Sequence, residues 1–189
     1  MKRLIINFIS YFVFCYFFIF LSSTLKADQY DIRLDKLFNN LKSSVSIEDA
    51  SLFEVQIWNI WMEHKNPNVK DKLFLGLEAM KYQEFEDALA YFSKIIQIEP
   101  KFAEGWNKRA TVLYMMGRYR ESEDDVIRTL ELEPRHFGAL SGQGLIRISL
   151  KDWSGAIEVL EEGLKINPHM LGAIMNLKYA RKMLKESMT

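Results

Sequence analysis

The chain has 189 residues, a length that suits one modest domain, and 49% of them are apolar, which is enough for a core. Its 25 basic residues equal its 25 acidic ones, so the sequence does not predict the basic surface that a nucleic-acid partner requires. The single cysteine, Cys15, lies in an apolar leading segment, so we expect no disulfide and no thiolate metal site in the rest of the chain.

Residues 1–27 are typical of an export signal. Lys2 and Arg3 precede an almost wholly apolar run over residues 4–21, and Ala27 supplies a small residue at the end of the segment. The run is also near the length that spans a bilayer. The sequence therefore predicts a cleaved signal peptide and a periplasmic protein. The alternative is an uncleaved anchor, which would attach the protein to the inner membrane and leave it facing the periplasm.

Residues 28–68 are predicted to form a pair of helices. The first lies within 28–43, and the second runs over 47–64 with apolar residues at steps of three and four. Pro67 ends the pair, and its separation from Pro100 nearly matches the separation of Pro100 from Pro134. That spacing suggests a degenerate copy of the unit that follows.

Two tryptophans, Trp58 and Trp61, lie in the second of these helices. They share its apolar face with Val55 and Met62. Large aromatic side chains on such a face dominate the burial of a core. We therefore expect core packing for both rings, with a ligand platform as the alternative.

A fixed step organises the remainder of the chain. Pro100, Pro134 and Pro168 are evenly spaced, and each closes a segment with two apolar helical faces. The clearest segment is 103–136, in which Gly117 separates the two faces. Self-similarity at a period of about 34 residues predicts a solenoid of helix–turn–helix units.

The step predicts three units and a cap. Gly76 is expected to let the two helices of the first unit approach closely, with Phe92 filling the space between them. A final helix with a polar outer face would close the exposed end of the stack, as solenoids require. The predicted ranges are 69–102, 103–136, 137–170 and, for the capping helix, 171–189.

These units resemble tetratricopeptide repeats (TPR), whose pattern is W-x2-L-G-x2-Y, then A-x3-F-x2-A, then P. Two positions depart from it, because Arg109 stands at the usual Leu and Ser122 at the usual small Ala. The chain also resembles small exported TPR proteins of alphaproteobacteria. The matching residues are Leu75, Gly76, Ala88, Phe92 and Pro100 in the first unit, Trp106, Ala110 and Pro134 in the second, and Gly144, Ala156, Leu160, Gly163 and Pro168 in the third.

The resemblance implies an all-α, right-handed superhelix with a concave groove that holds a peptide or a partner's helix. In this family the first helix of each repeat lines the groove. The groove residues so implied are Leu73, Leu77, Met80, Glu104, Asn107, Lys108, Thr111, Tyr114, Ser141 and Leu145. An alternative for Leu73 and Leu77 is packing against the helix over 47–64.

One version of the family binds carboxy-terminal Glu-Glu-Val-Asp peptides through a Lys/Asn clamp. The clamp positions fall here on Leu73, Leu77, Asn107 or Lys108, Gly138 and Gly142. Because leucines and glycines replace most of the polar anchors, the sequence disfavours a chaperone-tail adaptor.

Three polar residues form a second candidate site: Arg109, Arg135 and His136. Arg109 replaces an apolar packing residue, so we expect it to pair with Glu104 or Asp125, since buried charges are usually paired. A structural salt bridge and a ligand contact both stay open for this group.

The sequence predicts no enzyme, no cofactor and no metal site. None of the three histidines pairs with another at the i, i+4 spacing of a zinc-binding helix. The predicted function is a non-catalytic module that holds a peptide or helix of an envelope protein. The alternative is a scaffold or homo-oligomer that uses the outer helical faces. A ligand or catalytic site around Arg135 and His136 is a third, weaker hypothesis.

Overall fold

The computed structural model describes residues 28–188. Over this range the chain forms nine α-helices and one short 3-10 helix, and no strand. The prediction of an all-α fold is therefore confirmed. The elements are η2 (Asp28–Tyr30), α2 (Arg33–Ser43), α3 (Ile47–Met62), α4 (Pro67–Lys81), α5 (Phe85–Ile98), α6 (Ala103–Met115), α7 (Tyr119–Leu132), α8 (Phe137–Ser149), α9 (Trp153–Ile166) and α10 (Leu171–Ser187).

The predicted signal or anchor over residues 1–27 lies outside the described residues. Among the helices that are described, none is both long enough and apolar enough to cross a membrane. Export and membrane attachment through residues 4–21 therefore stay predictions from the sequence.

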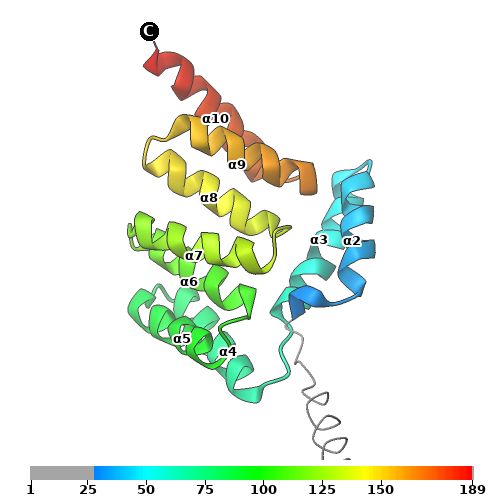
Figure 1. Ribbon diagram of the computed structural model, residues 1–189, viewed down its shortest axis with the longest axis vertical. Helices are drawn as coiled ribbons and strands as arrows, with labels where there is room; N and C mark the ends of the chain where they lie inside the picture. Colours follow the sequence, from blue (N-terminus) through cyan, green and yellow to red (C-terminus); the bar gives the residue numbers. More distant parts are fainter. Residues whose placement is uncertain (1–27, 189) are drawn as a thin grey trace, which may run out of the picture.

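Helices α4 to α9 form three antiparallel pairs that stack on one another, and α10 packs against the last pair. Figure 1 shows this stack rising from α4 and α5 to α10, with the turn inside each pair at one edge. The pairs lie within the units expected at 69–102, 103–136 and 137–170, except that α4 begins at Pro67. It begins there because the Asn66 side chain accepts a hydrogen bond of 2.9 Å from the Asn68 amide.

The turn inside each pair has the same backbone conformation in all three repeats, although its residues differ. Gln83, Gly117 and Lys151 occupy the same position of successive units, and their φ angles are 62°, 75° and 60°. This left-handed region favours glycine, because other residues have a Cβ that crowds the backbone. Only the middle repeat uses glycine at this position, and the other two repeats place an exposed residue there.

Within the first and third pairs, a glycine lets the two helices approach closely. A Cβ placed on Gly76 would lie 2.6 Å from the Phe92 ring, and one on Gly144 would lie 2.5 Å from the Leu160 side chain. Phe92 and Leu160 are fully buried in these contacts. The predicted contact between Gly76 and Phe92 is confirmed.

Helices α2 and α3, called the N-terminal hairpin below, do not continue the stack. Their main contacts with the repeats are made with α6, α8 and α9, and Met62 at the end of α3 also packs on the core of the first repeat. A degenerate repeat would instead pack α3 along α4. In Figure 1 the hairpin stands across the ends of the stacked helices. The interpretation of 28–68 as a degenerate repeat is therefore wrong in its packing, although the two helices exist. It failed because the spacing of two prolines says nothing about which face a helix pair buries.

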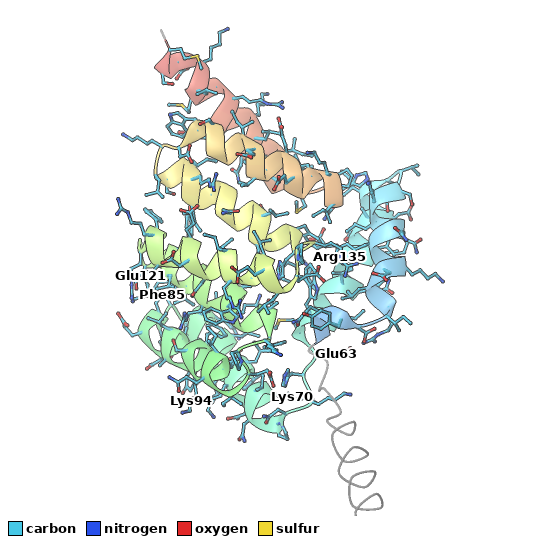
Figure 2. The ribbon with its side chains drawn as sticks, viewed as in Figure 1. Glu63, Lys70, Phe85, Lys94, Glu121 and Arg135 are labelled. Carbon is cyan, nitrogen blue, oxygen red and sulfur yellow. The ribbon has the colours of Figure 1, made fainter. Side chains whose placement is uncertain are left out.

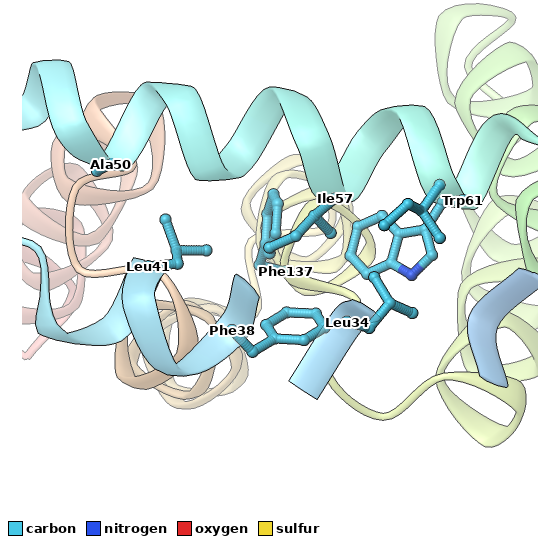
Figure 3. Packing of buried hydrophobic residues seen from close by; sticks show 8 residues of the cluster. Leu34, Phe38, Leu41, Ala50, Ile57, Trp61 and Phe137 are labelled. Atoms are coloured by element: carbon cyan, nitrogen blue, oxygen red, sulfur yellow. The ribbon is translucent and has the colours of Figure 1, made fainter. Parts of the chain in front are cut away.

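The N-terminal hairpin has an apolar core that includes one residue of the stack (Figure 3). That residue is Phe137, the first residue of α8, whose ring centroid lies 5.2 Å from Trp61 and 6.4 Å from Phe38. The buried members of this cluster are Leu34, Phe38, Leu41, Ala50, Ile57, Ile60, Trp61 and Phe137. The hairpin is thus joined to the repeats by shared apolar burial, the main favourable term in folding.

Polar contacts fix the hairpin and the short helix η2 before it at three equivalent positions of the stack, one in each loop that ends a pair. Gln29 donates a hydrogen bond of 2.6 Å to the carbonyl of Lys101. Arg135 pairs with Asp35 at 2.7 Å, and Figure 2 shows Arg135 between the stack and the hairpin. His169 Nε2 lies 2.9 Å from the carbonyl oxygen of Ser44. Positions 101, 135 and 169 are evenly spaced, so the hairpin follows the period of the repeats.

We predict opposite effects of alanine at two glycines of α8. Gly144→Ala should destabilise the protein by about 1–3 kcal/mol, because the new methyl group overlaps Leu160 in a packed interior. Gly142→Ala should be neutral or stabilising by roughly 0.5–1 kcal/mol, because a Cβ at Gly142 meets nothing within 4 Å and alanine favours the helix. Urea denaturation of both variants would measure this, and equal losses would contradict the close-approach explanation.

Candidate functional site

A cavity of about 310 Å³ lies between the second and third repeats and helix α3. Helices α6 and α8 form its floor, and Glu54 and Trp58 of α3 form one wall. Phe137 and Met170 contribute apolar surface where the stack meets the hairpin. This space is called the groove cavity below.

Six of the predicted groove residues line the groove cavity, namely Asn107, Lys108, Thr111, Tyr114, Ser141 and Leu145. They come from two helices that the repeating step sets in the same register. Tyr114 is held at the rim by Tyr119, at a centroid distance of 5.4 Å. Thr111 and Ser141 place small polar groups on the floor, and Leu145 places an apolar one.

The structure places the remaining predicted groove residues elsewhere. Leu73 is buried in the core of the first repeat, and Leu77 and Met80 are half-buried against that core. Met62 of α3 packs on the same cluster. The alternative expectation was that Leu73 and Leu77 pack on the helix over 47–64. Their burial in the repeat core, with Met62 of α3 beside it, is closer to that alternative than to a groove position.

Glu104 is buried rather than open to a partner, with 1% of its surface exposed. Its Oε1 lies 2.9 Å from the Lys108 ammonium, so this oxygen has an ion-pair partner but no hydrogen bond. Its Oε2 accepts a hydrogen bond of 3.1 Å from Asn107 and lies 3.0 Å from His136 Nε2. The prediction that Glu104 faces the groove is wrong, because the N-terminal hairpin covers the start of α6.

The hydrogen bonds of His136 assign a role to each ring nitrogen. Nδ1 accepts a hydrogen bond of 3.0 Å from the Ala139 amide and thereby caps α8, so Nδ1 carries no proton. The proton is therefore on Nε2, which donates to Glu104. The ring stacks on Trp61 at 4.0 Å with an angle of 10° between the planes. His136 is thus a structural residue with both nitrogens engaged.

The second candidate site, Arg109, Arg135 and His136, does not exist as a cluster. Arg109 donates two hydrogen bonds of 2.7 Å to Asp125, one of the partners expected for it. Arg135 pairs with Glu133 at 3.0 Å and lies over the Phe38 ring at 4.4 Å. The three residues serve three separate contacts, so the salt-bridge interpretation of Arg109 applies and the shared polar site is wrong.

Burial and charge act in opposite directions on Glu104. Burial alone would raise the pKa of its carboxyl group, whereas the Lys108 ammonium and the His136 hydrogen bond lower it. The result is a pKa below the ordinary value of 4.5. Glu104 therefore stays ionised inside the protein and balances the charge of Lys108.

Two residues of α3 line the site, Trp58, for which a ligand platform was the alternative to core packing, and Glu54, which was not expected from the sequence. Trp61 is buried as predicted, whereas Trp58 is half-buried and lines the groove cavity. Glu54 accompanies it and accepts a hydrogen bond of 3.0 Å from Asn167. The glycine at position 138 was the available sequence signal. It leaves room for the Trp58 ring, which would lie 2.6 Å from a Cβ at that position. Over residues 28–188, no three His, Cys, Asp or Glu side chains are grouped so that they could hold a metal ion.

We predict that the stability of a Glu104→Gln variant differs from that of the parent in a pH-dependent way. At about pH 7 the variant should be less stable by roughly 2–3 kcal/mol, because Lys108 loses its buried partner. Since the folded pKa of Glu104 is lowered, its contribution is complete above the ordinary pKa of 4.5 and is lost as the pH falls through the folded pKa. Denaturation curves across this range should therefore converge at low pH.

A matched control for this prediction is Glu121→Gln, which removes an exposed carboxylate paired with Arg118. It should change stability little, because exposed pairs are screened by water. A Glu104 variant with parental stability at neutral pH would contradict the buried ion pair.

No protein-family model matches the chain. Among curated proteins, a TPR repeat-containing protein of Rhizobium etli is 33% identical over 134 residues, which are 67% of this chain and 66% of that protein. The Hsp70-Hsp90 organizing protein 1 of Glycine max is 28% identical over 108 residues, which are 57% of this chain and 19% of that protein. The chain therefore spans about two thirds of the length of the first relative and about a fifth of the second.

Solved TPR domains have the same arrangement of helices. The Sgt2 TPR domain of Aspergillus fumigatus is similar at a TM-score of 0.62 and 21% identity, covering 65% of this chain and 82% of that domain. The first TPR of Spaghetti (RPAP3), bound to an HSP90 peptide, is similar at a TM-score of 0.62 and 18% identity, covering 64% and 96%. These likenesses support the fold. Together with the repeating step and the Rhizobium relative, they show that the chain belongs to the tetratricopeptide repeat family.

Proposed function

We propose that the protein is a non-catalytic interaction module that holds a segment of a partner protein in the groove cavity. The observation that carries the proposal is the meeting of six family groove positions around one hollow of about 310 Å³. A hollow of this size suits a few side chains of a peptide or helix rather than a whole domain. Mixed polar and apolar walls suit an amphipathic segment docked by a few anchors.

The relatives support a peptide-binding role of this kind. The first TPR of Spaghetti is solved with an HSP90 peptide, and the second TPR domain of human RPAP3 is solved with an HSP70 peptide. The partner proposed here is different. Of the clamp positions, Leu73 is buried and Lys108 is paired with Glu104, so the groove cavity does not offer the cations that an acidic tail requires.

The buried polar residues support a non-catalytic role. His136 and Glu104 are nearly inaccessible and bond to each other, to a helix start and to Lys108. A general base must lie within hydrogen-bond reach of its substrate. Neither group lines the groove cavity, so we propose binding rather than chemistry there.

The cellular location of the partner is proposed from the sequence. The positive start, the apolar run 4–21 and the small residue at Ala27 favour export to the periplasm or an inner-membrane anchor facing it. We therefore propose that the bound segment belongs to an envelope protein.

One observation favours the alternative of a scaffold. Helix α10 has no following helix on its outer side within the described residues, and it exposes 57% of Leu171 and 70% of Met175. Exposed apolar residues that gather on one helix are typical of contact surfaces. A partner that binds this face would not occupy the groove cavity.

Site-specific crosslinking of the full-length protein in its native cells would distinguish the two proposals. A photoreactive residue at Thr111 should capture a partner segment, whereas the same residue at Lys94 on the outer helix α5 should not (Figure 2). The double variant Tyr114→Ala with Leu145→Ala should weaken capture by roughly tenfold or more, since it removes two wall contacts.

Circular dichroism should show that this double variant keeps the helical content of the parent. Capture from Lys94 or α10 that persists in the folded double variant would contradict binding in the groove cavity and support the scaffold.

A further inference from the structure

We infer that the groove cavity selects a segment that places a lysine or arginine side chain against Glu54. The inference rests on the proposed function and specifies the chemistry of the partner. It follows from the charges of the groove cavity, from the position of the Glu54 carboxylate, and from the apolar surface beside it.

The groove cavity has two charged residues on its walls, Lys108 and Glu54. The ammonium of Lys108 is already neutralised by the buried carboxylate of Glu104, 2.9 Å away. The same ammonium lies 5.2 Å from the centre of the Trp58 ring, which holds it against the wall. Lys108 is therefore unavailable to an acidic ligand, and the charge left uncompensated is the negative charge of Glu54.

Glu54 is held in position but is not neutralised. It is half-buried on α3, and its Oε2 accepts a hydrogen bond of 3.0 Å from the Asn167 amide group. Among residues 28–188, no lysine or arginine forms an ion pair with this carboxylate. A carboxylate accepts several hydrogen bonds, so a ligand cation has free acceptor sites here.

The surfaces beside Glu54 suit the stem of a basic side chain. Trp58 lies one helical turn after Glu54 on α3, and Met170 lines the same wall from the loop before α10. Lysine and arginine bury their methylene groups on apolar surface while their charged ends reach a polar partner. An acidic side chain in the same place would meet the Glu54 carboxylate without a compensating cation.

Selection from a random peptide library displayed on phage tests this inference with the full-length protein as bait. Peptides retained by the parent should be enriched in lysine or arginine next to an apolar residue. The affinity of a selected peptide would then be compared with that of its Lys→Gln twin by fluorescence anisotropy. The twin should bind roughly tenfold more weakly, since a hydrogen bond between charged groups is lost.

The matched variants are Glu54→Gln and Glu48→Gln, on the same helix. Glutamine at position 54 keeps an acceptor for Asn167, so the fold should be retained. Glu54→Gln should remove most of the difference between the peptide and its twin, whereas the exposed Glu48→Gln should leave it unchanged. Glu54→Lys should reverse the preference toward acidic peptides.

The outcomes separate this inference from the function on which it rests. One outcome would overturn the inference and leave groove binding intact. In it, the peptides bind the parent but not the Tyr114→Ala variant, and their binding depends neither on a basic residue nor on Glu54. Selected peptides rich in acidic residues would overturn it as well. Peptides whose binding is unaffected by Tyr114→Ala would overturn the proposed function itself.

Discussion

The packing of Phe137 into the N-terminal hairpin is the contact on which the shape of the binding face depends. This residue begins α8, and its ring lies 5.2 Å from Trp61 and 5.7 Å from Trp58. It belongs to the stack by sequence and to the hairpin core by burial. Because it joins the two parts, α3 lies across the ends of the repeat helices and supplies a wall of the groove cavity.

Polar contacts next to Phe137 also join the hairpin to the stack. His136 caps α8, stacks on Trp61 and donates to Glu104, so one ring connects the hairpin to two repeats. A buried carboxylate is stable only with partners, and Glu104 has three of them. Glu104, Lys108 and His136 were candidate ligand contacts from the sequence, but they bond to one another within the protein. Under the proposed function, the surface left for a partner is the floor of α6 and α8, together with Glu54.

The repeats were predictable because their signal is local and periodic. The even spacing of the prolines, the small residues at Gly76 and Gly144 and the turn at Gly117 can all be seen in the sequence of the units themselves. The position of the hairpin was not predictable, because its contacts join residues far apart in the chain, such as Asp35 with Arg135. No periodicity marks such pairs. Glu104 was misplaced for the same reason. Its position in the repeat predicts a groove residue, and it is buried only because the distant hairpin covers it.

The polar cluster failed on different grounds. Arg109, Arg135 and His136 are all polar residues of one repeat, yet they lie on different sides of a helix or loop and meet different partners. Residues three and four apart share a helical face, whereas a turn between two helices sends neighbours in separate directions. Sequence proximity across the Glu133-Pro134 turn was therefore a poor guide to a site.

A double-mutant cycle between Trp61→Leu and Phe137→Leu, followed by urea denaturation, tests the docking of the hairpin most directly. If the rings pack as described, the two substitutions should be non-additive by about 1 kcal/mol, the size of an aromatic pair. Additive effects within a few tenths of a kcal/mol would mean that the hairpin does not rest on the start of α8. The groove cavity would then have no wall at Trp58 and Glu54.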